Sequence, residues 1–297
     1  MNKVLILGIT GYLGSELAKK LILYGYIVIG IKRKNSSINR LKSCEPQIKF
    51  CDIEDIDFKN FFQINPGIDT IINTATNYGR KDESFEEIFN SNLNIPLQLL
   101  HSATVSNIKN FINTDTTLNK YFNLYSFTKY QFFECGNFFS ANYPIKFLNV
   151  KLDYFYGEKE DNERFLSYVI NICITNTLEL KLTSGEQKRD FVYIDDVVNA
   201  YMVLIQNIEN FPTKFIEFEV GTGKPISIKD AVNFIHENTH SRTKLLYGSE
   251  PLRDKELLYS SANTSALTSL GWICRYDFFA GIKKVIIEKK NLLASFN

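Results

Sequence analysis

Tyr125 and Lys129, in the segment Tyr-Ser-Phe-Thr-Lys, are the pair of side chains in this 297-residue chain best suited to chemistry. On a helix, positions i and i+4 lie one above the other, so the phenol and the ammonium would face the same site. A neighbouring cation favours the ionised phenol and eases proton exchange near neutrality. Such a phenol can protonate a ketone oxygen while a hydride reaches the carbon. The same spacing also occurs on purely structural helices, so the surrounding elements must support the assignment.

Three glycines near the start of the chain, Gly8, Gly11 and Gly14, predict a phosphate-binding turn. They follow an apolar run at residues 4–7 and open a stretch of helical period over residues 13–21. A strand that turns through glycines into a helix directs backbone N–H groups and the positive end of the helix dipole at an anion. The expected ligand is a dinucleotide, although the usual dehydrogenase spacing is G-x-G-x-x-G.

Short β-rich runs alternate with helical segments through the first half of the chain, which predicts a doubly wound α/β fold with a parallel sheet. The expected strands are residues 4–7, 26–31, 48–51, 70–73, 111–114, 145–152 and 215–220. The charged segment 158–164 interrupts the alternation. We therefore expect a Rossmann-type domain of residues 1–156 plus about 190–224. A smaller α/β substrate lobe would comprise about 157–189 plus 225–297, with the substrate bound between the two.

Composition narrows the class of protein. The formal net charge is +1, so no polyanion-binding surface is indicated and nucleic acid is not an expected partner. The five cysteines are scattered and lack a C-x-x-C pair, which favours reduced thiols and no metal site. No apolar run approaches the ~18 residues that span a bilayer, and the first apolar run ends at Gly8 rather than forming a signal peptide. We expect a cytoplasmic protein without membrane contact.

The glycine spacing at the N-terminus, followed by Y-x-x-x-K, resembles the extended short-chain dehydrogenase/reductases, the NAD-dependent epimerase/dehydratase family, which act on nucleotide sugars. The resemblance covers nearly the whole chain, including segment 73–76 in place of the family's His-x-Ala-Ala, segment 182–198, and the Leu-Gly-Trp at 270–272. It implies cofactor contacts from the glycine turn, from the ends of three strands and from the Tyr–Lys pair. These residues are Gly8, Thr10, Gly11, Tyr12, Leu13, Gly14, Lys32, Arg33, Ser36, Asp52, Ile53, Ala75, Tyr125 and Lys129.

The end of the second predicted strand indicates which dinucleotide binds. Residues 32–37, Lys-Arg-Lys-Asn-Ser-Ser, include no acidic side chain to accept from the 2′-hydroxyl of NAD. Cations and hydroxyls there suit a 2′-phosphate, and the segment is similar to that of NADP-dependent GDP-mannose dehydratases. The alternative is a solvated basic turn. We expect NADP(H). Asp52 matches the position that holds the adenine, with a helix cap as its alternative role.

The resemblance also implies a third catalytic group, a Ser or Thr hydroxyl at the end of the fifth strand. Thr114 matches it and Thr116 is the alternative. In the family's 4,6-dehydratases, Thr-Asp-Glu at this place supplies an acid and a base, whereas this chain has Thr114-Asp115-Thr116. Dehydration is therefore disfavoured, and the Cys–His pair of GDP-fucose synthase is missing from the matching places. What remains is ketone reduction, or 4-epimerisation with NAD kept bound, and the basic strand end favours reduction.

Two arginines, Arg189 and Arg253, match family residues that contact the substrate diphosphate. An ion pair, for instance of Arg189 with Asp190 or Asp196, is the alternative. Lys151 and Tyr154 depart from the family's Arg-x-x-Asn-x-Tyr-Gly. The substrate-binding residues that the resemblance implies are Asn77, Arg80, Thr114, Asp115, Tyr154, Arg189 and Arg253.

Segments 77–80, 185–191 and 255–256 resemble the CDP-abequose and CDP-paratose synthases, which reduce the 4-keto group of a CDP-activated dideoxyhexose with NADPH. We therefore expect a CDP-, dTDP- or GDP-linked 4-keto-deoxysugar as substrate, in the biosynthesis of cell-surface polysaccharide such as the O-antigen of lipopolysaccharide. The alternatives are a nucleotide-sugar 4-epimerase or 4,6-dehydratase, and a non-catalytic NADP-sensing regulator. Aromatic residues on more than one face of the helix that bears Tyr125 suggest a homodimer.

Overall fold

The computed structural model describes residues 2–254 and 256–294 and divides into two compact units. The first runs to Leu152 and resumes with Tyr201–Phe218, and the second comprises Asp153–Ala200 and the chain from Glu219 onward. These bounds differ from the expected ones, which assigned residues 153–156, 190–200 and 219–224 to the sheet domain. The physical reason is that β7 (Tyr154–Tyr156) pairs with β10 (Phe191–Tyr193) in a separate two-stranded sheet.

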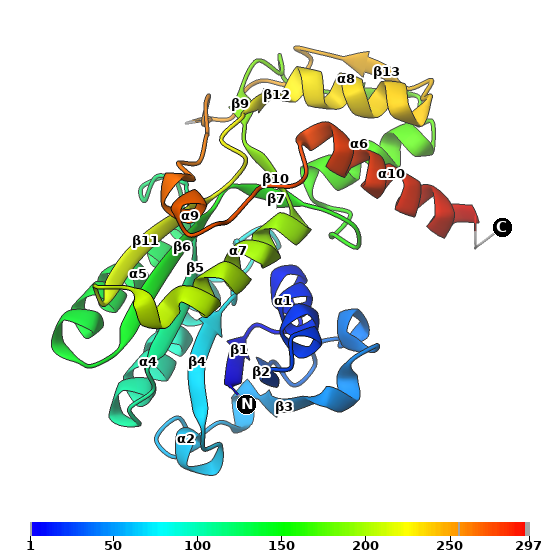
Figure 1. Ribbon diagram of the computed structural model, residues 1–297. Helices are drawn as coiled ribbons and strands as arrows, with labels where there is room; N and C mark the ends of the chain where they lie inside the picture. The colour runs from blue at the N-terminus through cyan, green and yellow to red at the C-terminus, as the bar shows by residue number, and fades with distance from the viewer. Residues whose placement is uncertain (1, 255, 295–297) are drawn as a thin grey trace. The chain divides into compact units, whose positions relative to one another are not determined.

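The first unit is built on a seven-stranded sheet in the order β11-β6-β5-β4-β1-β2-β3 (Figure 1). Its strands are β1 (Lys3–Leu7), β2 (Ile27–Lys32), β3 (Ile48–Asp52), β4 (Ile68–Asn73), β5 (Asn110–Thr116), β6 (Lys146–Leu152) and β11 (Phe215–Val220). Strands β1 to β6 pair in parallel, which confirms the predicted doubly wound α/β fold. The strand order reverses between β1 and β4, and ligands of such sheets bind at the carboxyl ends of the strands near this point.

Helices connect the strands of the first unit. They are α1 (Tyr12–Leu23), α2 (Phe61–Ile64), α3 (Phe85–Phe89), α4 (Ile95–Val105), α5 (Leu124–Asn142) and the C-terminal part of α7 (Ile194–Asn207). A π-helix, Asn90–Asn94, joins α3 to α4, and short 3₁₀ turns lie at Asn39–Leu41, Glu45–Gln47, Ile53–Asp55 and Ile208–Asn210.

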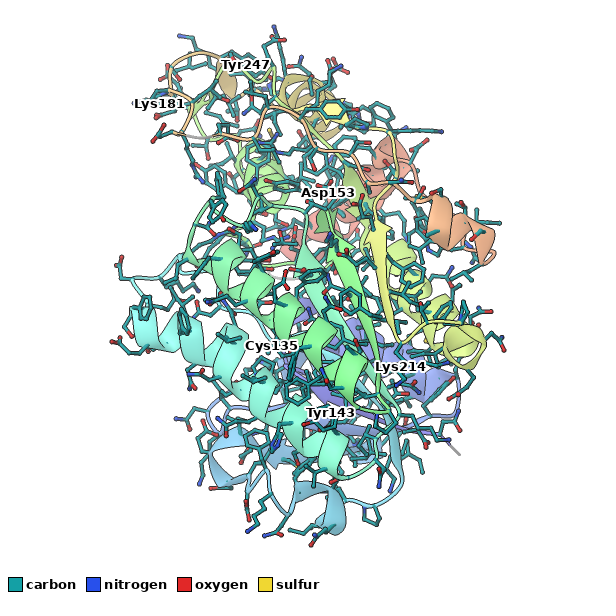
Figure 2. All side chains as sticks on the ribbon, turned by 90° about the vertical axis from the view of Figure 1, so that its left-hand side faces the viewer. Cys135, Tyr143, Asp153, Lys181, Lys214 and Tyr247 are labelled. Atoms are coloured by element: carbon teal, nitrogen blue, oxygen red, sulfur yellow. The ribbon has the colours of Figure 1, made fainter. Side chains whose placement is uncertain are left out.

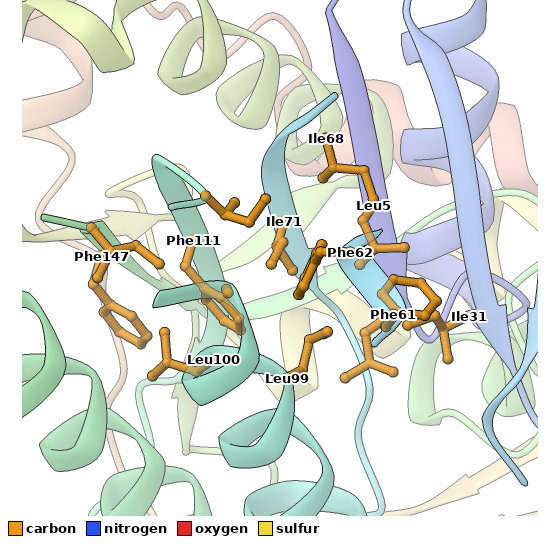
Figure 3. Packing of buried hydrophobic residues seen from close by; sticks show 14 of the residues in the cluster. Leu5, Ile31, Phe61, Phe62, Ile68, Ile71, Leu99, Leu100, Phe111 and Phe147 are labelled. Atoms are coloured by element: carbon orange, nitrogen blue, oxygen red, sulfur yellow. The ribbon is translucent and has the colours of Figure 1, made fainter. Parts of the chain in front are cut away.

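The apolar core of the first unit lies between one face of the sheet and the helices α2, α4 and α5. Leu5, Phe111 and Phe147 come from three strands, and Leu99 and Leu100 pack on them from α4 (Figure 3). Alternate strand residues point to opposite faces of a sheet. Asn73, Asn113 and Asn149 each lie two residues beyond a core residue of β4, β5 or β6, so they point to this same face.

Helix α5 approaches the sheet closely because it carries a glycine where it crosses β6. A Cβ atom on Gly136 would overlap the ring of Phe147. The first turn of α5 is fixed by a capping box in which the Asn123 side chain accepts from Ser126 N at 2.9 Å and Ser126 Oγ accepts from Asn123 N at 3.2 Å. This turn bears Tyr125, so the cap and the glycine together determine where the phenol lies.

The second unit combines small sheets with helices around an aromatic cluster. Its remaining elements are α6 (Phe165–Ile174), β8 (Glu179–Lys181), β9 (Lys188–Arg189), β12 (Ile226–Ser227), α8 (Ile228–Thr239), β13 (Lys244–Leu246), α9 (Ser265–Ser269) and α10 (Phe278–Ala294). Tyr156, Phe191 and Phe278 pack together, and the Tyr156 hydroxyl donates to Phe278 O at 3.0 Å. Within the part of the chain that the structure describes, no helix is both long and apolar enough to cross a bilayer.

Candidate active site

The glycine turn between β1 and α1 has the close packing that a phosphate cradle requires. Gly8 has a φ of +83° and donates its N–H to Ile31 O at 3.1 Å. A Cβ atom on Gly8 would overlap the backbone of Ala75, and one on Gly14 would overlap Gly8 O. Gly11 is exposed and is the N-cap residue before α1, where no side chain caps the helix. The first-turn N–H groups of a helix have no intrahelical acceptor, so this turn fits a dinucleotide pyrophosphate.

The basic segment after β2 lies against carboxylates of the neighbouring strand end. Lys32 and Asp52 are register partners in β2 and β3, and Lys32 Nζ lies 2.5 Å from Asp52 Oδ1. Asp52 precedes the turn Ile53–Asp55 but makes no side-chain cap there, so its alternative role as a helix cap is wrong. Arg33 is exposed, and among the described residues no carboxylate pairs with it. Ser36 N donates to Arg33 O at 2.9 Å in a turn.

The segment after β4 is fixed to α5 and the π-helix by one buried asparagine. Asn92 accepts from Asn77 N at 2.7 Å and donates to Asn77 O at 2.8 Å and to Thr128 Oγ1 at 3.1 Å. The guanidinium of Arg80 lies 4.8 Å from the ring centroid of Tyr78. The Tyr78 ring in turn lies 5.0 Å from that of Tyr125.

Tyr125 and Lys129 lie one turn apart on α5, as predicted, and both are buried. Lys129 is 1% exposed, and its ammonium donates to Thr114 O at 2.6 Å and to Ala75 O at 3.5 Å. Burial lowers the pKa of Lys129 to about 8, and the nearby carboxylate of Asp115 opposes this shift. The lysine thus joins α5 to the carboxyl ends of β4 and β5.

The two threonines proposed for the third catalytic group differ in their surroundings. Thr114 is buried inside β5, and its hydroxyl lies 2.6 Å from the hydroxyl of Tyr201 on α7. Thr116 is the last residue of β5, is half-buried, and accepts from Leu118 N at 3.2 Å. Sequence reasoning missed Tyr201, because its position in an apolar helix gives no sign of a polar contact.

Asp115 belongs to a row of polar side chains that crosses three strands. Asn73, Asn113 and Asn149 are register partners on β4, β5 and β6, and all three are fully buried. Their amides are hydrogen-bonded in sequence, Asn73 to Asn113 at 3.0 Å and Asn113 to Asn149 at 2.8 Å. Asn149 Nδ2 donates to Asp115 Oδ2 at 2.8 Å. The signal in the sequence was an asparagine directly after an apolar pair in each of the three strands, at residues 71–73, 111–113 and 147–149.

The predicted substrate residues Tyr154, Arg189 and Arg253 belong to the second unit. Arg189 is 4% exposed, and its Nη2 lies 2.5 Å from Glu256 Oε1 and its guanidinium 5.4 Å from the Tyr154 ring centroid. Arg189 therefore does form an ion pair, but with Glu256 rather than with Asp190 or Asp196. Arg253 is exposed.

The aspartates proposed as partners of Arg189 bind backbone groups instead. Asp190 accepts from Thr222 N, Gly223 N and Ala262 N. Asp196 accepts from Arg275 N and Tyr276 N. Both carboxylates thus hold loops of the second unit in place.

The parallel sheet, the glycine turn after β1 and the Tyr125–Lys129 pair on α5 together define a Rossmann-type protein. The model of the NAD dependent epimerase/dehydratase family matches residues 4–221. The chain belongs to this family, and its members use nicotinamide cofactors.

Relatives resemble the chain over nearly its full length. A CDP-abequose synthase of Salmonella muenchen is 35% identical, over 97% of this chain and 98% of the relative. Among solved structures, a UDP-glucose 4-epimerase of Thermotoga maritima with UDP-glucose matches with a TM-score of 0.85 at 20% identity, covering 98% of this chain and 99% of that one. A UDP-glucuronic acid 4-epimerase of Bacillus cereus, in complex with UDP-glucuronic acid and NAD, matches with a TM-score of 0.83 at 19% identity, covering 98% and 99%.

The buried ammonium makes the stability of the fold depend on pH in a defined direction. The pKa of Lys129 is lowered from 10.5 to about 8, so between these values the folded state binds fewer protons than the unfolded chain. Stability contributed by this group therefore rises with pH. We expect the free energy of unfolding of the wild type, relative to Lys129→Met, to rise by about 2 kcal/mol between about pH 7 and 9.5. Urea unfolding across this range measures it.

An exposed lysine provides the control. Lys109 lies just before β5 and is exposed, so Lys109→Met should retain the pH dependence of the wild type. A difference between wild type and Lys129→Met that stays constant or falls with pH would show that burial does not hold the pKa of Lys129 down.

Proposed function

We propose that this protein reduces the 4-keto group of a nucleotide-activated deoxyhexose with NADPH, as a cytoplasmic enzyme of deoxysugar biosynthesis. The similarity to CDP-abequose synthase over the whole chain supports this class of substrate. The observation that favours reduction over dehydration concerns Asp115. This carboxylate accepts hydrogen bonds from groups of the protein itself, and the residue after it is a threonine. Asp115 Oδ1 accepts from Thr116 N and Oδ2 from Asn149, and with Thr116 in place of a glutamate the acid and base pair of the dehydratases is incomplete.

The residues of α5 provide the proton chemistry of this proposal. Bound NADPH supplies the hydride that reaches C4 of the sugar. Tyr125 donates its phenolic proton to the carbonyl oxygen, so the ketone becomes a secondary alcohol. The Lys129 ammonium, one turn along the same helix, stabilises the phenolate that remains.

A threonine hydroxyl at the end of β5 would donate a hydrogen bond to the same oxygen. We propose Thr116 for this role, the alternative left open by the sequence, in place of Thr114. Thr116 ends the strand, where ligands of parallel sheets bind. The Thr114 hydroxyl is instead buried against Tyr201.

Removal of the Tyr125 hydroxyl tests the mechanism. Tyr125→Phe should lower turnover at least about 100-fold, because no other group delivers the proton. Binding of NADPH, followed by its fluorescence, should stay within about twofold of wild type. The assay follows loss of NADPH absorbance with CDP-, dTDP- and GDP-linked 4-keto-6-deoxysugars. Normal reduction by Tyr125→Phe would refute this mechanism.

The two threonines form a matched pair within the same experiment. Thr116→Val should lose about 10- to 100-fold in kcat, as removal of one donor to a developing oxyanion does. Thr114→Val should retain kcat within about threefold and lower the melting temperature instead, since it leaves the Tyr201 hydroxyl buried without its hydrogen-bond partner. A larger loss of kcat in Thr114→Val than in Thr116→Val would show that Thr114 has the catalytic role.

NADPH is preferred in this proposal because of the cations at the end of β2. Lys32 is paired with Asp52, so Arg33 is the cation that could bind the 2′-phosphate without breaking an existing ion pair. Its planar guanidinium suits a phosphate in bidentate geometry.

Cofactor preference of an Arg33 variant tests this assignment. Arg33→Ala should raise the KM for NADPH about 10- to 100-fold, the value of one or two charge-assisted hydrogen bonds, and leave the KM for NADH within about twofold. Lys42→Ala removes another exposed cation of the same stretch and should change neither value. Equal KM changes for both cofactors in Arg33→Ala would contradict a role at the 2′-phosphate.

The Lys32–Asp52 ion pair also supports a second candidate, a 4-epimerase that keeps NAD bound, because it lowers the net positive charge at the end of β2. Stoichiometry separates the two activities. A reductase consumes one NADPH per sugar, whereas an epimerase interconverts two nucleotide sugars without net consumption. A regulator that senses NADP would bind the cofactor and turn over neither.

We further propose that the protein is a homodimer formed through α4 and α5. The two helices lie side by side, with Cys135 midway along α5 and Tyr143 at its end (Figure 2). Seven residues of this face line an open, largely apolar groove: Leu97, Gln98, His101, Glu134, Cys135, Phe138 and Phe139. Phe138 is 60% exposed, so the groove presents apolar area that a second copy would cover.

Mass in solution tests the dimer. The chain of 34.3 kDa should give a particle of twice that mass, and Phe138→Asp should convert it to monomers by placing a charge in the covered groove. Ile273→Asp, at an exposed apolar residue of the second unit, should leave the dimer intact. A monomeric wild type in light scattering would exclude the proposal.

A further inference from the structure

We infer that Asn149 is a positioning residue for the proposed reaction: through Asp115 it holds the charge that keeps Lys129 protonated, and Asn113 and Asn73 hold Asn149 in turn. The inference rests on the proposed function for the role of Lys129 in proton transfer. It concerns side chains of the first unit alone, on β4, β5, β6 and α5.

Three asparagines in the middle of a parallel sheet require an explanation. Their strand positions face the core side of the sheet, where apolar residues are usual. Burial of an amide without hydrogen bonds costs several kcal/mol, and here every amide of Asn73, Asn113 and Asn149 is bonded to the next. A purely structural core would satisfy the same positions with apolar side chains.

The two ends of the row impose one direction on its hydrogen bonds. Ala75 N can only donate, so Asn73 presents its oxygen there at 3.2 Å. Asp115 as a carboxylate can only accept, so Asn149 presents its nitrogen. Both ends require the same orientation of all three amides, and the row therefore directs its final N–H group at Asp115.

Asp115 connects the row to Lys129. Its second oxygen accepts from Thr116 N at 2.8 Å, so two donors on different strands hold the carboxylate. Its negative charge opposes the effect of burial on the Lys129 ammonium, which donates to the adjacent Thr114 O. The row also returns to the lysine at its other end, because Ala75 O lies 3.5 Å from Lys129 Nζ.

Other titratable groups lie close to Asn149, Asp115 and Lys129. Asn149 Nδ2 also donates to Glu217 Oε2 at 3.3 Å, and Glu217 is paired with Lys151 at 2.6 Å. Burial raises the pKa of the Tyr201 hydroxyl on α7, and the negative charge of Asp115 acts in the same direction. Tyr125 lies on α5 itself. The amide of Asn149 thus donates to two carboxylates, and its loss would leave Asp115 with the Thr116 N–H as its donor and without the link to β6.

The test measures the protonation of the Lys129 ammonium directly. Protein labelled with ¹⁵N-lysine gives an Nζ resonance for Lys129, identified by its loss in Lys129→Met, and a pH titration follows it in wild type and Asn149→Leu. In Asn149→Leu the Asp115 carboxylate keeps only the Thr116 N donor and can turn away from Lys129, and the leucine brings apolar surface close to the buried charges; both changes disfavour the ammonium. We expect the Lys129 pKa to fall by about one unit in Asn149→Leu.

Asn110→Leu is the matched control. Asn110 lies on β5, is buried like Asn149, and donates to Thr70 Oγ1 of β4, but at the end of β5 away from Lys129. It should lower the melting temperature and leave the Lys129 titration in place. If Asn149→Leu does not fold, Asn149→Ser removes the amide donor with less change of polarity and should give the same downward shift.

The outcomes separate the inference from the proposed function. An unchanged or raised Lys129 pKa in both Asn149 variants, or the same fall in Asn110→Leu, overturns the inference whatever the enzyme does. A fall confined to the Asn149 variants supports it. The alkaline limb of kcat against pH should then move with the titration. If the titration moves and that limb does not, the positioning of Lys129 stands and its proposed catalytic role fails.

Discussion

The ammonium of Lys129 is buried at the carboxyl end of the sheet, and neighbouring residues of the first unit stabilise it there. An isolated buried cation is strongly disfavoured, so it requires acceptors and a compensating charge. The carbonyl of Thr114 provides an acceptor and Asp115 provides the charge. Both belong to β5, so the strand that forms the centre of this half of the sheet also fixes the lysine of α5.

The elements of the first unit could be predicted from the sequence, because each depends on a local pattern. Apolar runs gave β1 to β6 within two residues, and Y-x-x-x-K gave the helical pair of Tyr125 and Lys129. The contacts among sites could not be predicted, because they depend on register. Lys32 meets Asp52 only because β2 and β3 pair in one particular alignment, and the same holds for the asparagines of β4, β5 and β6.

Two of the cations that the sequence analysis assigned to phosphate have carboxylate partners within the protein. Lys32 is paired with Asp52, and Arg189 with Glu256. Such pairs keep long side chains extended before any ligand arrives, which reduces the entropy lost on binding. A phosphate that bound at either cation would compete with the carboxylate already there, and such competition favours dianionic or chelating groups over single weak anions.

Gly136, which packs against Phe147, lies on the same helix as Tyr125 but in a different turn. Eleven residues of helix, roughly 16 Å, separate Gly136 from Tyr125. A rigid helix behaves as a lever, so a larger residue that pushed α5 off β6 at this point would tilt the other end and move the phenol. The position of Tyr125 is therefore set partly by a residue without a side chain, about three turns further along the same helix.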